Sequence, residues 1–358
     1  MKSAATWNNG AHKEPLREKG AIIQMNIHKQ IGVDLASFDR LLREVVISDR
    51  DLSPPSVVLE SVVNLINSGG KRLRPLMVML GSRFGVSGHE SAVMKTAVLL
   101  EYLHMASLVH DDIIDQSDMR RGMPTLHETT DVQTAVHIGN YMIARAIEWA
   151  AGHPGEESDG ASEAVSEEDA YRLAELAALV TELCMGEYDQ LHHRFNYDLT
   201  MEQYLEKTRC KTALLMAHCL KAGAEAAKAD ARTAELLFQF GEALGMAFQI
   251  RDDLLDFTQS KETIGKPAGA DLRNGNITLP VIYALNEPAL AAKIRQLGPG
   301  SADADMDEVI LRIAGSSATE QSEELARSYA EQVQLMIGEL ADHPARCDLQ
   351  ALLHYFLP

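Results

Sequence analysis

The sequence predicts an all-α fold of roughly ten or more helices. Apolar residues recur three and four positions apart through most of the 358-residue chain, which is the spacing of a buried helix face. Alternating runs typical of strands are scarce, and aromatic residues make up only 5% of the chain. Alanine, leucine, glutamate and methionine are abundant and favour helices. With 46% apolar residues, the chain can bury a sizeable core.

The expected helices follow one another from residue 34 onward. Apolar residues recur at helical spacing over 34–46, 57–68, 93–110, 170–191, 201–220 and 231–257. Three segments break the pattern, at 152–169, 258–280 and 297–308. The first is acidic and nearly free of large apolar residues, so it predicts a surface loop between two helices. The segment 258–280 is rich in Gly, Lys and Asp. Both it and the segment 297–308 predict further surface connections.

The pattern favours one domain over residues 29–358, after a flexible leader at 1–28. The leader lacks the apolar core of a signal peptide, and Met25 is an alternative start. No apolar run is expected to reach the length of a membrane span. The four cysteines form no CxxC pair and indicate neither a zinc site nor a disulfide framework, so we expect a cytoplasmic location.

The acidic net charge of the chain limits the kinds of ligand that it is expected to bind. The net charge is −19, from 33 basic and 52 acidic residues. Nucleic acid is not expected as a partner, because binding it needs a clustered basic surface. A cationic ligand, or metal ions that bridge to an anionic ligand, fits this charge better.

Two short acidic motifs share the pattern DDxxD. The first is Asp111, Asp112 and Asp115, and the second is Asp252, Asp253 and Asp256. On a helix, positions four apart lie on one face, so each motif pairs two like charges within an apolar stretch. The alternative is a solvated acidic face or a helix cap. Mg²⁺ prefers carboxylate and phosphate oxygens, so two facing motifs could hold several Mg²⁺ ions and grip a diphosphate.

Basic groups near these motifs indicate phosphate binding. Arg120 and Arg121 follow the first motif directly, and arginine binds phosphate through a two-pronged hydrogen-bonding head. His104 lies two turns before Asp111 on the same face, although it could also be a core histidine. Weaker signals, which also fit a basic turn or solvated side chains, are Lys71, Arg72, Arg74, Lys211, Thr212 and Lys266.

These segments resemble those of a known family. GGKRLRP, HMASLVHDDIIDQSDMRRGMPTLH, KTALL, GMAFQIRDDLLDFT and GKPAGADLRNGNITLP occur in the order found in the trans-isoprenyl (polyprenyl) diphosphate synthases. The resemblance runs from about residue 30 to the end of the chain and is highly specific. It implies a single large bundle of mostly antiparallel helices around a deep central cavity, normally dimeric. It also implies a Mg²⁺-dependent prenyltransferase that condenses isopentenyl diphosphate head-to-tail onto an allylic diphosphate.

The resemblance implies roles for individual residues. Lys211, Thr212 and Arg120 would act in catalysis. The six motif aspartates would hold about three Mg²⁺ ions. The allylic diphosphate would be bound by Arg120, Lys211, Thr212, Gln249 and Lys266, and isopentenyl diphosphate by Lys71, Arg74, His104 and Arg121.

The length of the prenyl product is the most specific expectation. Ala106 and Ser107, five and four positions before the first motif, are small and would leave a channel open for a long product. Residues 181–285 resemble the catalytic subunit, component 2, of two-component heptaprenyl diphosphate synthases. We therefore expect a C35 product for the side chain of a quinone such as menaquinone, made from a farnesyl diphosphate primer. The resemblance further implies a heterodimer with a small non-catalytic subunit, or a homodimer, and at most peripheral membrane contact for product release.

Several alternatives stay open. The chain could be a shorter-chain synthase that makes geranylgeranyl or farnesyl diphosphate. A non-catalytic subunit of a prenyl synthase pair should have lost acids or arginines that this chain keeps. A type I terpene cyclase would lack the second DDxxD. The sequence also departs from the family pattern: Gly139-Asn140 replaces a Gly-Asp pair, the acidic loop is long, and the end of the chain has no basic tail.

Overall fold

The computed structural model describes residues 27–49, 51–52, 54–151, 167–258, 268–340 and 342–357. The part of the chain that the structure describes is 75% helical with almost no strands, which confirms the all-α class. The helices are α2 (Leu35–Ile47), α3 (Val57–Asn67), α4 (Leu73–Ser82), α5 (Glu90–Ile114), α6 (Leu126–Thr129), α7 (Val132–Ala150), α8 (Glu167–His192), α9 (Met201–Thr208), the π-helix η1 (Arg209–Ala213), α10 (Leu214–Ala226), α11 (Ala231–Thr258), α13 (Ala270–Arg273), α14 (Leu279–Ala284), α15 (Pro288–Ile294), α16 (Asp303–Ala314), α17 (Ser317–Glu339) and α18 (Arg346–Phe356). Strands β1 (Met119–Arg120) and β2 (Met123–Pro124) form a small antiparallel pair.

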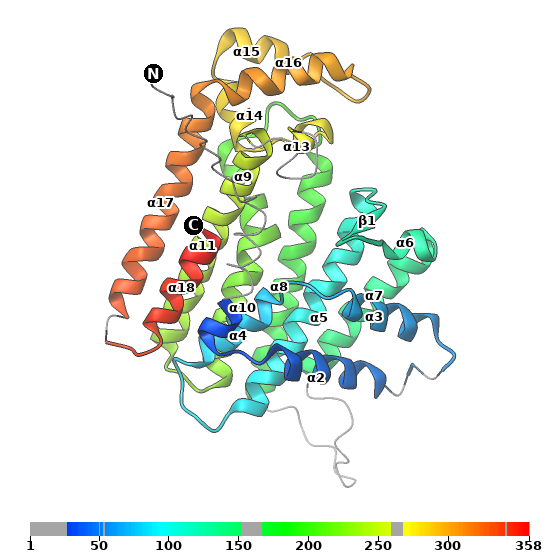
Figure 1. Cartoon of the computed structure of the whole chain (residues 1–358), viewed down its shortest axis with the longest axis vertical. Coiled ribbons are helices and arrows are strands. Elements are labelled where there is room, and N and C mark those ends of the chain that lie inside the picture. Colours follow the sequence, from blue (N-terminus) through cyan, green and yellow to red (C-terminus); the bar gives the residue numbers. More distant parts are fainter. Residues whose placement is uncertain are drawn as a thin grey trace, which may run out of the picture.

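The long helices form the body of the bundle (Figure 1). α10 lies between α4 and α11, and α17 packs against α11. Glycines allow the closest approach: a Cβ on Gly223 of α10 would collide with the carbonyl oxygen of Val78, and one on Gly81 of α4 with that of Leu220. α5 packs against α4, α7 and α10, and this arrangement surrounds the helix that carries the first acidic motif.

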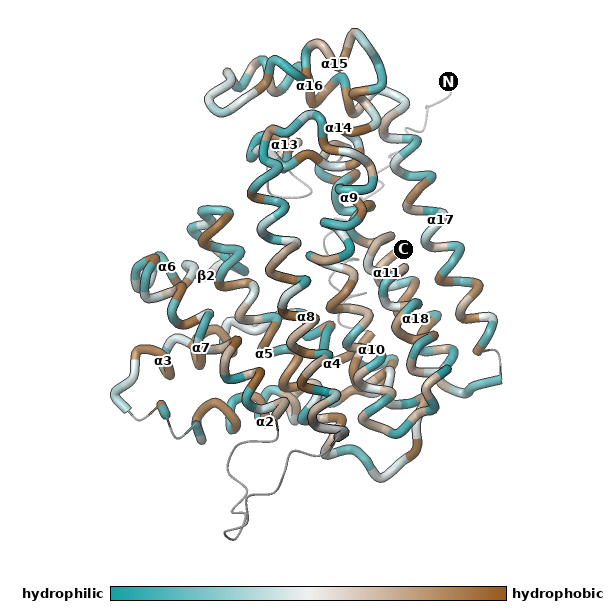
Figure 2. The backbone as a smooth tube through the Cα atoms, turned by 180° about the vertical axis from the view of Figure 1, so that it is seen from behind, coloured by the Kyte–Doolittle hydropathy of each residue, from teal (hydrophilic) through white to brown (hydrophobic). Residues whose placement is uncertain are grey.

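Two clusters of buried apolar side chains stabilise this arrangement. The larger cluster joins α2, α3, α4, α5, α7, α10 and the first half of α11, with Phe38, Leu76 and Phe240 fully buried. From behind, hydrophobic residues concentrate in this part of the bundle, around α4, α5 and α10 (Figure 2). Burying one such side chain contributes about 1.5–3 kcal/mol. The smaller cluster joins α9, the end of α11 and α13–α16, and so supports the helix end that carries the second motif.

Most expected helices are observed, with three corrections. The expected continuous helix over 201–220 is α9 and α10 with a π-helical turn between them. The connection expected over 297–308 is also shorter than predicted, because α16 begins at Asp303. Asp303 and Asp305 lie in its first turn, where negative charge is favourable beside the free backbone N–H groups. Short α13 and α14 likewise interrupt the segment 258–280.

The expectation that no apolar run reaches the length of a membrane span also needs correction. By length and composition alone, α5 could cross a membrane, but 56% of its apolar window is buried inside the bundle. A core helix passes the same test, and α5 packs as one. Residues 1–26 of the predicted leader and 152–166 of the predicted acidic loop lie outside the described residues, so these parts stay predictions. The described ends of both segments are helical instead: a helix includes residues 27 and 28, and α8 begins at Glu167.

Candidate active site

The two acidic motifs lie at the ends of two long helices. Asp111 and Asp112 are in the last turn of α5, and Asp115 is its C-cap. The second motif occupies the last two turns of α11. α10 packs against both helices, and the π-helix that precedes it packs against α11, α8 and α9. The sequence placed both motifs on helices, and the structure agrees.

The first motif is partly buried and partly neutralised: Asp112 is buried, Asp111 is half-buried and Asp115 is exposed. The Oδ1 atom of Asp112 accepts a hydrogen bond from Nε of Arg120 at 2.6 Å. One Asp111 oxygen is buried without a hydrogen-bond partner. Burial raises the pKa of Asp111 to about 7, and the nearby Glu187 carboxylate adds to this effect while Lys211 opposes it. The free oxygen and the raised pKa both show that this carboxylate lacks sufficient positive charge.

The second motif shows the same shortage of positive charge. Asp253 is buried and accepts hydrogen bonds from the Tyr204 hydroxyl at 2.7 Å and from Nε2 of Gln249 at 2.8 Å. Burial raises the pKa of Asp253 to about 6, against the opposing charge of Lys207. Asp256 accepts the backbone N–H groups of Ala270 and Asp271, each at 3.1 Å. These donors hold the α13 turn against the motif.

The donor chemistry fits a hard divalent cation. The groups are carboxylates, one with a buried oxygen without a partner, and a cation would relieve their mutual repulsion. Within the part of the chain that the structure describes, no three His, Cys, Asp or Glu side chains converge as a ready-made metal site. Arg120, Tyr204 and Gln249 instead hold individual carboxylates. The predicted Mg²⁺ ligands therefore stay a prediction, supported by chemistry rather than by a preassembled cluster.

Lys211 and Thr212 lie on the π-helix and reach both motifs. Thr212 Oγ1 donates to Oε1 of Gln249 at 2.9 Å, and the same Gln249 donates to Asp253. Lys211 Nζ lies 3.0 Å from Glu187, and its positive charge also acts on Asp111. Two predicted allylic-site residues, Thr212 and Gln249, are thus joined to the second motif, and the neighbouring Lys211 lies beside Glu187. Lys266, the fourth residue predicted there besides Arg120, lies outside the described residues.

A tight turn positions the two arginines after the first motif. β1 and β2 pair Arg120 with Met123, and the two residues between them both have positive φ, 54° at Arg121 and 80° at Gly122. This matches a type I′ turn. The Arg121 guanidinium donates to the Gly69 carbonyl oxygen and lies against Gly70, where a Cβ would collide with it. The turn therefore brings Arg121 to the loop before α4.

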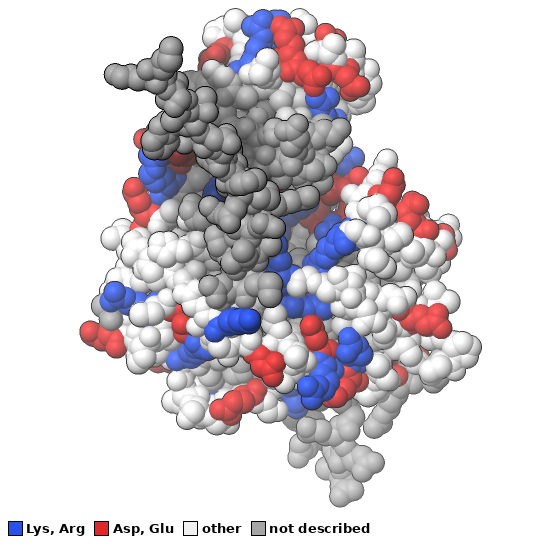
Figure 3. Space-filling model, in the orientation of Figure 1, with Lys and Arg blue, Asp and Glu red and all other residues white. Residues whose placement is uncertain are grey.

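Two of the residues predicted to bind isopentenyl diphosphate, Arg74 and Arg121, lie near a third, His104. Burial lowers the pKa of His104 well below its ordinary value, and Arg74 and Arg121 are the largest nearby charges that add to this effect. Nε of Arg74 is buried without a hydrogen-bond partner. Lys71, the fourth residue predicted there, is exposed. Basic side chains also gather near the middle of one face of the molecule, beside acidic ones (Figure 3). The arrangement suits an anion.

Arg72 has a different role from its neighbours. It is only 4% exposed and pairs with Asp39 at 2.8 Å and Glu101 at 2.9 Å. It also donates to the Ile66 carbonyl oxygen. Its donors are therefore committed to the fold, and the weak signal that grouped it with the phosphate-binding residues is corrected.

The chain-length residues lie where the spacing predicts, on α5 before Asp111. Ala106 is fully buried in the larger core cluster. Ser107 donates its hydroxyl to the His104 carbonyl oxygen at 2.8 Å. No described contact places a product channel beside them, so their role stays a prediction. Gly139, interpreted as structural, allows α7 to approach the His110 ring on α5.

Sequence reasoning missed several charged residues of the site. Glu187 on α8 pairs with Lys211, and Arg194 lies 3.9 Å from Asp115. Lys207, buried on α9, opposes the charge of Asp253. Burial and the nearby Asp253 and Asp256 raise the pKa of Asp271 to about 7. Only Asp271 had a sequence signal, because it lies within the GKPAGADL segment.

Comparison with known proteins identifies the family. The polyprenyl synthetase family model matches residues 55–312. The chain belongs to this family. A heptaprenyl diphosphate synthase component 2 from Geobacillus stearothermophilus is 40% identical over 298 residues, 83% of this chain and 88% of the relative. Its counterpart from Bacillus subtilis is 35% identical over 322 residues, 90% of this chain and 87% of the relative.

Solved structures agree with this assignment. The heptaprenyl diphosphate synthase from Staphylococcus aureus superposes with a TM-score of 0.78 at 32% identity, over 91% of this chain and 97% of that one. A polyprenyl synthase from Caulobacter crescentus, solved with calcium and isoprenyl diphosphate, gives a TM-score of 0.76 at 30% identity, over 93% of this chain and 97% of that one. The chain is a prenyltransferase with the isoprenoid synthase fold, and it belongs with the long-chain trans-prenyl diphosphate synthases.

Proposed function

We propose that this polyprenyl synthetase condenses isopentenyl diphosphate with an allylic diphosphate in the presence of Mg²⁺ and makes heptaprenyl (C35) diphosphate. The observation that carries the proposal is the position of η1. Thr212 connects through Gln249 to Asp253 in the second motif, while Lys211 lies close enough to Asp111 for its charge to act on the first. A diphosphate beside η1 would meet both acidic motifs and a fixed positive charge.

The residues divide between two substrates. Lys211 and Arg120 supply positive charge toward the allylic diphosphate, which gains negative charge as its C–O bond breaks. Mg²⁺ ions held by Asp111, Asp112, Asp115, Asp252, Asp253 and Asp256 would neutralise the same diphosphate. Arg74, Arg121, His104 and Lys71 would hold the diphosphate of isopentenyl diphosphate. Because the two sites meet at the end of α5, the second substrate's alkene can approach the allylic carbon.

Each bond that breaks in the proposed reaction is matched by one that forms. The allylic C1–O bond breaks, and its electron pair leaves with the diphosphate. The alkene of isopentenyl diphosphate then forms the new C–C bond with the allylic carbocation. A proton leaves the new five-carbon unit for the departing diphosphate, and a double bond forms. The apolar surroundings of α5 would keep water from the cation, since water would convert it to an alcohol.

The proposed enzyme includes a second subunit. The two curated relatives from Geobacillus and Bacillus are named as component 2 of a heptaprenyl diphosphate synthase, which points to a further component. We propose that this chain works in the cytoplasm with a small non-catalytic subunit, and that its product serves a quinone such as menaquinone. A homodimer that is active alone is the alternative.

Product sizing tests the proposal. The purified chain, with and without a co-expressed small subunit, would be incubated with Mg²⁺, farnesyl diphosphate and labelled isopentenyl diphosphate. The expected product is C35, formed fully only with the second subunit and lost when a chelator removes Mg²⁺. A product that stops at C15 or C20 would overturn the chain-length proposal, and full C35 synthesis by the single chain would overturn the two-subunit proposal.

A further inference from the structure

An arginine on the far side of η1 joins three helices. Arg209 Nη2 lies 2.9 Å from Glu182 of α8 and 3.0 Å from Glu206 of α9, and its Nη1 lies 3.3 Å from Glu242 of α11. A second bond, from Nε of Arg209 to Glu206 at 3.0 Å, makes that pair bidentate. Bidentate pairing fixes a guanidinium more firmly than a single contact does.

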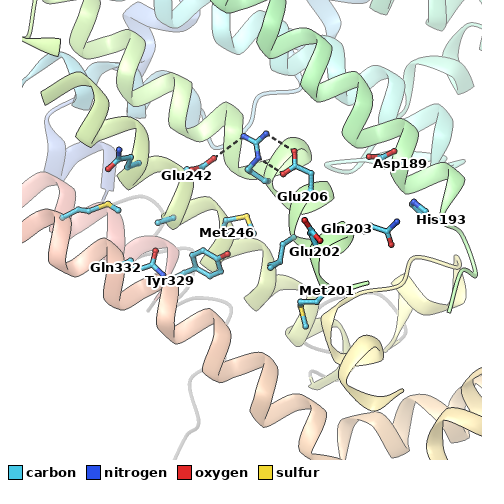
Figure 4. A pocket seen from close by; sticks show the side chains of 15 residues that line it. Asp189, His193, Met201, Glu202, Gln203, Glu206, Glu242, Met246, Tyr329 and Gln332 are labelled. Carbon is cyan, nitrogen blue, oxygen red and sulfur yellow. Dashed lines mark hydrogen bonds and ion pairs between the residues drawn. The ribbon is translucent and has the colours of Figure 1, made fainter. Parts of the chain in front are cut away.

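Arg209 faces a pocket that is separate from the acidic motifs. The pocket has a volume of about 1030 Å³ and is lined by residues of α8, α9, η1, α11 and α17. None of the residues that the sequence assigned to substrate or metal lines it. Figure 4 shows the pocket, with dashed lines that join the arginine to Glu206 and Glu242. Arg209 and Lys211 are two positions apart, and residues at this spacing point to different sides of a helix.

The π-helix is held tightly on two sides. A Cβ on Gly186 of α8 would lie 2.8 Å from Cβ of Cys210, and one on Gly245 of α11 would lie 2.5 Å from Cα of Ala213. The N–H of Leu214 donates to the carbonyl of Arg209, five residues earlier, instead of four as in an α-helix. Such turns are rare and persist where surrounding contacts enforce them, often at functional sites.

We propose that Arg209 is a positioning residue that enforces the π-helical turn and thereby directs Lys211 and Thr212 at the allylic diphosphate. This inference rests on the proposed function for the role of those two residues. If the π-helical turn relaxed to an α-helix, the residues before it or those after it would shift by one position. Their side chains would then rotate about the helix axis by about 100°. Lys211 would then leave Glu187, or Thr212 would leave Gln249. The three carboxylates around Arg209 oppose this change because they belong to three different helices.

The test compares Arg209→Met with a matched control. Arg145 also pairs with three carboxylates, Asp49, Asp51 and Glu148, but it lies on α7. Both substitutions remove an arginine that holds together several segments, so a general loss of stability would affect both variants. Arg209→Lys keeps the charge but cannot form the same forked contacts.

Kinetics gives the first readout. Arg209→Met should lower kcat by about ten- to a hundredfold, as a misplaced catalytic group does. Its KM for isopentenyl diphosphate should stay unchanged, because that site is on α4, α5 and the β1–β2 turn. Arg209→Lys should share the defect, and Arg145→Met should keep the wild-type kcat. Equal loss in both Met variants, or wild-type kcat in either Arg209 variant, would overturn the proposal.

Cysteine labelling gives a second readout that does not depend on activity. Cys210 is buried on η1, and Cys219 is fully buried on α10. In Arg209→Met, alkylation of Cys210 should become faster while that of Cys219 stays slow, because only the turn loosens. Unchanged labelling of Cys210, or equal acceleration at both cysteines, would overturn the proposal. Since labelling needs no substrate, an inactive wild type would count against the proposed function without affecting this result.

Discussion

At the scale of single residues, the sequence predicted the groups that lie close together along the chain. Asp111 and Asp115 share a face because a helix places positions four apart together, and the structure has them at the end of α5. Glu187, Lys207 and Arg194 were missed because α8, α9 and the loop between them bring these residues to the site from distant parts of the sequence. Arg72 was placed with the wrong group, since its partners Asp39 and Glu101 are also distant in sequence.

The first prediction concerns the acidic motifs. Asp111→Ala and Asp252→Ala should each lower turnover by at least about a hundredfold, because each removes a group that stabilises charge in the transition state. Steady-state rates with saturating Mg²⁺ would measure this. Asp305→Ala, at an exposed site on α16, is the control and should keep wild-type turnover. A near-normal rate in either motif variant would refute the metal-binding role of that motif.

The second prediction concerns pH. Burial, with the charges of Arg74 and Arg121, holds the pKa of His104 below its ordinary value, so the folded protein keeps this ring neutral. The unfolded chain binds a proton there below pH of about 6.5. The His104 contribution to stability is therefore fully present above that pH, and is lost as pH falls through 6.5 toward the lower folded pKa.

Thermal unfolding between pH 7.5 and 5.5 would measure this loss. In His104→Asn, Tm should fall less over this range than in the wild type. His354→Asn, which changes an exposed histidine on α18, should behave as the wild type does. If His104→Asn and the wild type lose Tm in parallel, His104 is not the group responsible.

At the scale of elements, hydrophobic spacing predicted the long helices and did not predict their irregular parts. Residues 201–220 read as one helix, because a π-helical turn changes the register by one residue without a sequence marker. The contacts that enforce it, Gly186 on one side and Gly245 on the other, come from helices outside that segment. The start of α16 was missed for another reason: its acidic first turn resembles a solvated loop in the sequence.

The third prediction concerns α5 and product length. Ala106 is fully buried five positions before Asp111, so Ala106→Phe should block a channel that runs along α5 from the metal site. Short products should accumulate, while the rate of the first condensation stays as in the wild type. Radiolabelled product sizing would measure both. Because a larger side chain in a packed core can destabilise it, thermal unfolding must show that the variant is folded. A folded variant with unchanged product length would exclude this position from the channel.

At the scale of the whole molecule, the all-α bundle was the easiest feature to predict. It depends on composition and on spacing repeated over hundreds of residues, so local errors at 201–220 and 297–308 do not change it. Assembly is harder to predict, because it depends on what covers the surface. Met185, Tyr188 and Leu191 recur every three residues on α8 and are 51%, 57% and 40% exposed. Large apolar side chains grouped on one exposed face indicate a binding surface.

The fourth prediction assigns this α8 face to the small second subunit proposed above. Tyr188→Glu combined with Leu191→Glu should prevent co-purification of that subunit, since each change puts a charge into an apolar contact. Light scattering on the co-expressed pair would give the mass of the assembly. The control is Leu311→Glu, at a residue that is 74% exposed on α16 and should leave the assembly intact. Normal assembly of the α8 variant would place the contact elsewhere.

The most direct test of the account is calorimetric binding of an unreactive allylic diphosphate analogue to the wild-type chain, with and without Mg²⁺. The central claim is that two acidic motifs hold one diphosphate through metal ions that they share. We expect tight binding with Mg²⁺ and almost none in a chelator, because the carboxylates alone repel the diphosphate. Asp111→Ala and Asp252→Ala should each weaken the Mg²⁺-dependent binding. Tight binding without Mg²⁺, or binding that survives the loss of either aspartate, would contradict it.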